Sequence, residues 1–164
     1  MLPDPAAARI LHTSDWHLGV SVWNRSRAED HDTAIAEVVD IARAAQPDLI
    51  LHTGDLFDGH RPPMADFGRA IVALRDLAEI APVVVLAGNH DSAAALEVLG
   101  TAVGDQLSDE LDAGSYEPLR PCRQRIRVHA RPTTAGKGAV ATYPSKSGGE
   151  IRLAALPFVH SDRS

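Results

Sequence analysis

The sequence predicts an α/β fold built around a mainly parallel sheet. In the first hundred residues, short apolar runs alternate with segments of helical periodicity, three of each. Such alternation implies parallel strands joined by right-handed crossovers. The first two apolar runs begin two similar stretches of sequence, RILHTSDWHLG (9–19) and LILHTGDLFDG (49–59). In both, the apolar residues are followed by His-Thr, a small residue and Asp. The third, PVVVLAG, is uniformly apolar, which is typical of a strand that is covered on both faces.

The helical segments follow from the spacing of their apolar residues. The strand RILHTS leads into the segment AEDHDTAIAEVVDIARAAQ, which Gln46-Pro47-Asp48 ends before the strand LILHTG. Pro62-Pro63 then opens a second helix, MADFGRAIVALRDLAE. A third, DSAAALEVLGTAVG, follows the strand PVVVLAG. The residues expected to face the core, in the order of the three helices, are Ile35, Val38, Val39 and Ala42; Phe67, Ile71, Leu74 and Ala78; and Leu96, Leu99 and Val103.

The pattern changes after about residue 105. The segment GDQLSDELDAGSYEPLRP is typical of a loop. Three short strand candidates follow it, RIRVHAR (125–131), GAVATY (138–143) and IRLAALPFV (151–159), separated by turn residues. We expect this second part to be a run of short antiparallel strands.

Composition places the chain among ordinary globular proteins. Its 164 residues fit one domain or an incomplete piece of a larger one. No apolar run is long enough for a membrane span, and the start MLPDPAAARI lacks the pattern of a secretory signal. The single cysteine, Cys122, suits a reducing compartment, so a cytoplasmic location is expected. The net charge of −6 argues against a simple electrostatic binder of nucleic acid.

Polar residues follow each of the three predicted parallel strands. Asp15 and His17 follow the first, Asp55 follows the second, and Asn89-His90-Asp91 follows the third. Ligands of open parallel sheets bind beyond the carboxyl ends of the strands. A single Asp at such a position is usually a turn or cap residue, but D-x-H, G-D and G-N-H-D in this order favour a site. The mixture of oxygen and imidazole ligands suits manganese, iron or zinc better than calcium.

The motifs SDWHLG, GDLFD and GNHD resemble those of calcineurin-like metallophosphoesterases. Within that superfamily, LHTSDWHLG, LAGNHDS, the late LPF and the R-x-E-D of Arg27, Glu29 and Asp30 are similar to the SbcD-type nuclease subunits of bacterial DNA repair. The likeness is sharp over residues 9–100 and diffuse from there to residue 164. It implies a β-sandwich flanked by helices, an αββα arrangement.

The resemblance also implies roles for individual residues. Asp15 and His17 would bind one metal ion, Asp55 would bridge two, and Asn89 would bind the second. His90 would stabilise the transition state or protonate the leaving oxygen, and Asp91 would orient its ring. The implied cofactors are two divalent ions, with manganese favoured. The implied function is that of a metal-dependent nuclease acting on DNA ends and hairpins in repair, recombination and replication, with an SbcC-like ATPase partner and a possible homodimer.

The resemblance further implies three histidine ligands from the C-terminal half of the family's domain, in G-H and G-H-x-H elements, and neither element occurs past residue 100 of this sequence. Past residue 100 the only histidines are His129 and His160, and no glycine precedes either. His160, at the end of an apolar strand, is the better ligand candidate, but we expect it to be a surface or terminal residue. The sequence therefore predicts that residues 1–164 are the N-terminal part of a phosphoesterase domain, without its C-terminal half or capping region and with reduced activity. Two alternatives stay open: a general phosphoesterase acting on a small phosphoester, and an inactive fragment.

Other features carry two interpretations each. His12 and His52 are expected to be buried or behind the ligands rather than ligands themselves. The alternating residues of RQRIRVHAR are expected on one strand face, either solvated or tracking phosphates. Trp16 and Trp23 flank the first loop, where packing is favoured over base stacking. The alternating face comprises Arg123, Arg125, Arg127, His129 and Arg131.

Overall fold

The computed structural model describes residues 7–104 and 125–159. The elements follow in the order β1 (Ile10–Thr13), β2 (Ser21–Val22), β3 (Arg25–Ser26), α1 (Ala28–Ala45), β4 (Leu49–His52), α2 (Met64–Ile80), β5 (Val83–Leu86), α3 (Ala93–Val103), β6 (Ile126–His129), the short 3₁₀ helix η2 (Ala135–Lys137), β7 (Val140–Pro144) and β8 (Glu150–Ala154).

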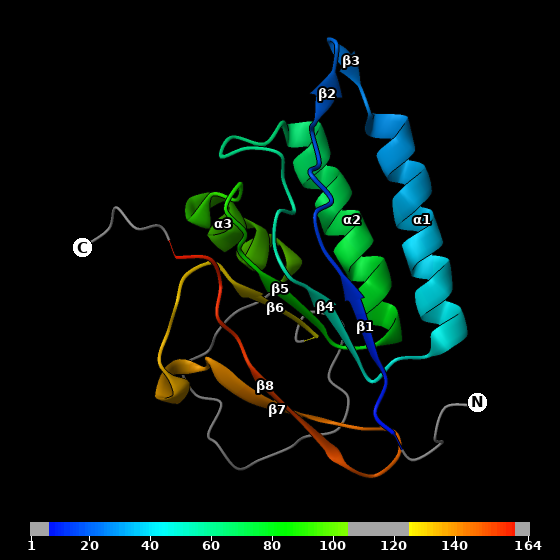
Figure 1. Ribbon diagram of the computed structural model, residues 1–164, viewed down its shortest axis with the longest axis vertical. Helices are drawn as coiled ribbons and strands as arrows, with labels where there is room; N and C mark the ends of the chain where they lie inside the picture. Colours follow the sequence, from blue (N-terminus) through cyan, green and yellow to red (C-terminus); the bar gives the residue numbers. More distant parts are fainter. Residues whose placement is uncertain (1–6, 105–124, 160–164) are drawn as a thin grey trace.

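The central sheet has four parallel strands in the order β1-β4-β5-β6. Figure 1 shows the three helices on one face of this sheet and the antiparallel pair β7-β8 on the other. The predicted α/β fold class, with a parallel sheet flanked by helices, is confirmed. The described residues include no α-helix on the outer face of β7-β8, so the second helix layer of the expected αββα arrangement is not among them. The hairpin β2-β3 projects from the end of the molecule at which β1 and β4 finish.

Strand β6 differs from the expectation. It pairs in parallel with β5 and thereby completes the first sheet, whereas β7 and β8 form the expected antiparallel pair. Ile126 and Val128 are buried in the same core cluster as Val83 and Val85. Burial against α3 therefore places this run of residues on the edge of the parallel sheet.

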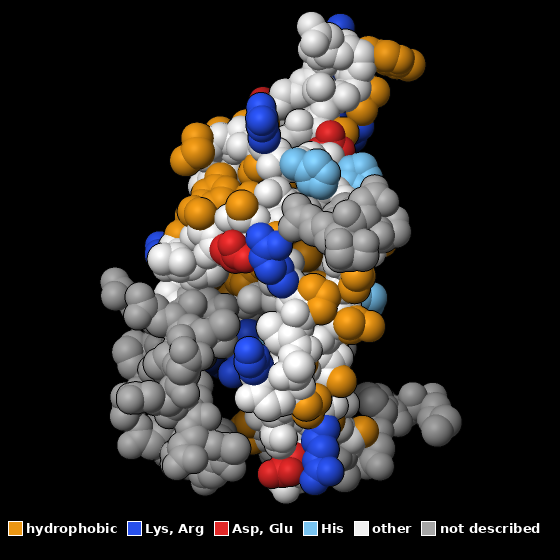
Figure 2. All heavy atoms as spheres, turned by 90° about the vertical axis from the view of Figure 1, so that its left-hand side faces the viewer, with side chains coloured by type: hydrophobic (Ala, Val, Ile, Leu, Met, Phe, Trp, Pro, Cys, Tyr) orange, Lys and Arg blue, Asp and Glu red, His pale blue; other side chains and the backbone are white. Residues whose placement is uncertain are grey.

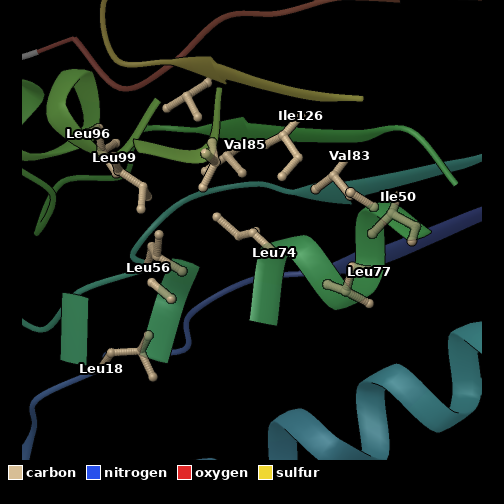
Figure 3. Close-up of a cluster of buried hydrophobic side chains, with 14 of the residues drawn as sticks. Leu18, Ile50, Leu56, Leu74, Leu77, Val83, Val85, Leu96, Leu99 and Ile126 are labelled. Atoms are coloured by element: carbon tan, nitrogen blue, oxygen red, sulfur yellow. The ribbon is translucent and has the colours of Figure 1, made fainter. Parts of the chain in front are cut away.

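The core lies between the sheet and the helices (Figure 3). The predicted inner faces of all three helices pack here, with Ile35, Val38 and Ile71 partly rather than fully buried. A smaller cluster on the other face joins Leu49 and Val84 to Ile151 of β8. The central strands β4 and β5 are consequently covered on both faces, as the uniformly apolar run PVVVLAG predicted. Ser92 caps α3 by accepting a hydrogen bond from the Ala95 amide, so α3 begins directly after the G-N-H-D motif.

The second sheet is tied to the first by a buried carboxylate. Asp48, at the start of β4, accepts hydrogen bonds from the amides of Arg9 at 2.7 Å and Lys146 at 2.5 Å. Desolvation is the largest single effect on this group and raises its pKa, but the two hydrogen bonds and the Lys146 charge together outweigh it and hold the pKa below the ordinary value.

Within residues 7–104 and 125–159, no helix is long and apolar enough to cross a membrane.

Candidate metal centre

The loops that follow β1 and β4 run side by side beyond the sheet. The amides of Asp15 and His17 donate to the carbonyls of Gly54 and Asp55, each at 3.0 Å, and Leu18 donates to Leu56 at 3.0 Å. These bonds continue the parallel pairing of the two strands through the polar motifs. The two similar stretches of sequence, residues 9–19 and 49–59, therefore lie next to each other in space.

The backbone at three of the polar residues is left-handed. Asp15, His17 and Asp55 have φ values of 56°, 46° and 53°. This conformation is uncommon outside glycine, although Asp and His adopt it more readily than most residues. It ends the alternation of side chains that an extended strand imposes, and it costs about 1–3 kcal/mol per residue. Such strain concentrates at functional sites.

The loop after β5 locks Asp55 in place through close backbone contact. The His90 amide donates to Asp55 Oδ1 at 2.9 Å. A Cβ on Gly88 would lie 2.1 Å from that same oxygen and 2.3 Å from the Asp55 amide nitrogen. Only glycine fits at position 88, which explains why the G-N-H-D motif begins with it.

Asp91 holds the loops together. Its carboxylate is buried and accepts hydrogen bonds from the amides of Leu56 at 3.2 Å, Phe57 at 3.0 Å and Gly88 at 2.9 Å. The ring of His90 is held by a different residue, because its Nδ1 lies 2.9 Å from the carbonyl oxygen of Asp58. The expectation that Asp91 orients this ring is therefore corrected, and a catalytic role for Asp91 stays a prediction.

Three side chains converge on one point. His17, Asp55 and His90 offer ligand atoms that all lie within 4.8 Å of one another, the one such group among the described residues. His17 Nε2 lies 3.9 Å from Asp15 Oδ1 and 3.9 Å from Asp55 Oδ2. Asn89 lines an adjacent cavity of about 340 Å³ together with Asp15 and Asp55. The structure thus brings all the predicted site residues to one edge of the sheet.

This donor set fits divalent cations. Carboxylate oxygens, an imidazole and an amide oxygen are the mixture that manganese, iron and zinc accept. The Asp55 side chain is only 12% exposed and is fixed, whereas the Asp15 side chain is 66% exposed. Figure 2 shows histidine side chains gathered beside an acidic one on one face of the molecule. That these residues bind metal stays a prediction.

The pKa of His90 is raised above its ordinary value. The main cause is the hydrogen bond to the Asp58 carbonyl, with further contributions from the carboxylates of Asp55, Asp58 and Asp91, while desolvation opposes the shift. A raised pKa retains a proton on the imidazole closer to neutral pH. This is the property that a general acid needs.

His52 is buried behind the centre, as expected. His12 is exposed, so burial is wrong for that residue, and that it is not a metal ligand stays a prediction. His12 Nε2 lies 2.7 Å from Thr53 Oγ1. The His52 ring packs edge-on against Trp16, and neither of its nitrogens has a hydrogen-bond partner in the described part of the chain. Burial disfavours the charged imidazole and lowers the pKa of His52 to about 4.

This histidine predicts a pH dependence of stability. Between pH 6.5 and 4 the unfolded chain binds a proton at position 52 that the folded chain does not. The free energy of unfolding is therefore highest above pH 6.5 and falls as the pH decreases toward 4, by roughly 3 kcal/mol at most from this group. Urea unfolding at pH 7.5 and pH 5 measures the change. His52→Leu should reduce the decrease, and an equal decrease in both proteins would contradict this explanation.

The expectations for His129, in β6, and for Trp23, after the first loop, are wrong. His129 is buried, with a pKa lowered to about 4 mainly by desolvation, so the expected solvated face that it shares with the arginines is wrong at this residue. Packing is correct for Trp16, which contacts the core, but wrong for Trp23, which is 95% exposed. His160, Arg123 and Cys122 lie outside the described residues.

Sequence reasoning missed Asp58. It is the last residue of the GDLFD motif, and no role was assigned to it. The sequence could have indicated a role for Asp58, because this residue lies three positions after Asp55 and adds a second carboxylate to the same loop. In the structure it contacts both imidazoles of the centre.

Comparison with known proteins agrees with this geometry. The family model described as calcineurin-like phosphoesterase matches residues 8–157. The SbcD subunit of the nuclease SbcCD from Escherichia coli K12 is 42% identical over 91 residues, 54% of this chain and 22% of that protein. The Bacillus subtilis SbcD subunit is 34% identical over 142 residues, 85% of this chain and 34% of that protein. The DNA double-strand break repair protein Mre11 of Sulfurisphaera tokodaii is 42% identical over 89 residues, 51% of this chain and 22% of that protein. The matches span about a fifth to a third of these relatives.

Proposed function

The chain belongs to the calcineurin-like phosphoesterase family, and from this premise we propose that residues 1–164 are the N-terminal part of the catalytic domain of an SbcD-type nuclease. The observation that carries the proposal is the convergence of His17, Asp55 and His90, from three successive loops, beside Asp15 and Asn89. Relatives named as nucleases and as a break-repair protein support DNA as the substrate.

The residues divide into ligands and a proton donor. Asp15, His17, Asp55 and Asn89 would hold two divalent ions, for which we propose manganese. When bound, such ions supply electrostatic stabilisation of the phosphodiester and lower the pKa of water. Because Nδ1 of His90 lies against the Asp58 carbonyl, Nε2 is the ring nitrogen left for the substrate, and the ring in its imidazolium form would give the Nε2 proton to the leaving oxygen.

The surroundings of the centre favour an extended substrate over a small one. The β2-β3 hairpin begins four residues after His17 and carries the exposed Trp23 at its tip. Figure 1 shows it projecting beyond the helices, and Figure 2 shows an apolar side chain standing out at that end of the molecule. DNA ends and hairpins processed in repair and recombination are the proposed substrates. An SbcC-like ATPase, a second copy of the chain and a cytoplasmic location belong to the same proposal.

A nuclease assay with His90→Ala tests this function. With Mn²⁺, the wild-type chain should cleave linear and hairpin DNA at the reduced rate expected of residues 1–164, and His90→Ala should be slower still by roughly 100- to 10,000-fold because general acid catalysis is lost. Asp40→Ala, which removes an exposed carboxylate on α1, should cleave like the wild type.

Two results would overturn the nuclease proposal. Cleavage of a small chromogenic diester without cleavage of DNA would indicate a general phosphoesterase. Equal cleavage of DNA by the wild type and His90→Ala would show that the reaction does not occur at this centre.

A further inference from the structure

Asp58 contacts both imidazoles of the centre, with two different parts of the residue. Its carbonyl oxygen lies 2.9 Å from Nδ1 of His90. Its carboxylate oxygen Oδ1 lies 3.5 Å from Nδ1 of His17. The two rings themselves lie edge to face, with their centroids 4.8 Å apart. One residue therefore contacts Nδ1 of both rings, and at His17 it lies at the nitrogen opposite the one that faces Asp55.

We propose that Asp58 is a positioning residue that sets the tautomer of both histidines. Its carboxylate holds a proton on Nδ1 of His17 and its carbonyl holds one on Nδ1 of His90, so that Nε2 of each neutral ring is left without a proton. Nε2 of His17 faces the carboxylates of Asp15 and Asp55. The inference rests on the proposed function, because it assigns to His17 the part of a metal ligand.

The two contacts differ in rigidity. The backbone at Asp58 is fixed, because its amide donates to the Leu18 carbonyl at 3.1 Å and the preceding Phe57 amide donates to Asp91 at 3.0 Å. The carbonyl is therefore held against His90 regardless of the side chain at position 58. The Asp58 carboxylate is 42% exposed and has room to rotate.

His17 needs this carboxylate. Its Nδ1 is buried and has no hydrogen-bond partner in the described part of the chain, and a buried polar atom without a partner is destabilising. A small rotation of the Asp58 side chain closes the 3.5 Å separation to a hydrogen bond. The opposite ring atom, Nε2, already lies 3.9 Å from each of Asp15 and Asp55.

The tautomer matters for metal binding. A neutral imidazole binds a cation only through its unprotonated nitrogen, and the partner of the other nitrogen decides which one that is. Loss of such an outer partner typically reduces metal affinity by 10- to 100-fold. Without the Asp58 carboxylate, nothing in the described surroundings of His17 Nδ1 selects the tautomer that directs Nε2 at the centre.

The test compares side-chain variants of the whole chain. In metal-free protein at pH 8, ¹⁵N NMR of the imidazoles should show His17 protonated on Nδ1 in the wild type and in Asp58→Asn, whose amide oxygen also accepts. Asp58→Ala should shift His17 toward the Nε2-protonated tautomer and reduce Mn²⁺ affinity about 10- to 100-fold by calorimetry. His90 should keep its tautomer in every variant, because a main-chain carbonyl holds it. Asp58→Ser, too short to reach His17, replaces Asp58→Ala if the latter does not fold.

The outcomes separate this inference from the proposed function. An unchanged His17 tautomer in Asp58→Ala overturns the positioning role, whatever the Mn²⁺ affinity. A His90 tautomer that changes along with that of His17 also overturns it, because this would indicate a general disturbance of the loop. If the tautomer responds as expected while the wild type binds no Mn²⁺, the positioning contact stands and the proposed function fails.

Discussion

Replacing Gly88 with alanine is expected to destroy the metal centre and to destabilise the fold. The new Cβ would lie 2.1 Å from Asp55 Oδ1 and 2.3 Å from the Asp55 amide nitrogen. Rotation of the Asp55 side chain cannot relieve the clash with its own backbone, so the loops after β4 and β5 must separate. Overpacking of this kind costs about 1–3 kcal/mol, and the displaced Asp55 would no longer face His17 and His90. Urea unfolding and Mn²⁺ calorimetry measure the two effects.

Gly68→Ala is the matched control for this variant. Gly68 lies on an exposed position within α2, where an added Cβ meets nothing within 4 Å. The same substitution there should raise the free energy of unfolding by about 0.5–1 kcal/mol, because alanine favours the helix, and leave Mn²⁺ binding unchanged. A Gly88→Ala protein as stable as the wild type would contradict the close packing of the two loops.

Asp55→Asn is expected to abolish metal binding while preserving the fold. The asparagine oxygen can still accept the hydrogen bond that the His90 amide gives to Asp55 Oδ1, so the loops stay together. The centre nevertheless loses the fixed and mostly buried carboxylate that faces His17. Because loss of an outer partner alone reduces affinity 10- to 100-fold, loss of this ligand should reduce Mn²⁺ affinity by more than about 100-fold.

The control for Asp55→Asn is Asp40→Asn, which changes an exposed carboxylate that pairs with Arg43 on α1. It should bind Mn²⁺ like the wild type. Unchanged Mn²⁺ affinity in Asp55→Asn would show that cations bind elsewhere, for instance through the exposed Asp15 alone.

The sequence predicted the parts of the fold that depend on hydrophobic periodicity. The inner faces of α1, α2 and α3 were correctly identified, and the uniformly apolar run PVVVLAG is covered on both faces. The parallel pairing of β6 was not foreseen, because a run of seven residues with alternating arginines carries no signal for the direction of its neighbour. The burial of Ile126 and Val128 against the helix layer explains why β6 joins the parallel sheet.

The site was predictable to the level of residues but not of contacts. The order of motifs after successive strands brought Asp15, Asp55 and His90 to one edge, since parallel strands end on the same side. The left-handed backbone at Asp15 and Asp55 has no signature in residue type, because Asp is common in ordinary turns as well. For the same reason the contacts of Asp58 and Asp91, which depend on the path of the loops, appear only in the structure.

The central claim is that the three loops form a centre for divalent cations. Isothermal titration of Mn²⁺ into the wild-type chain, with Asp55→Asn in parallel, tests it most directly. We expect saturable binding to the wild type below the millimolar range and its loss in Asp55→Asn. A folded wild-type chain that binds no Mn²⁺ even at millimolar concentrations would contradict the claim.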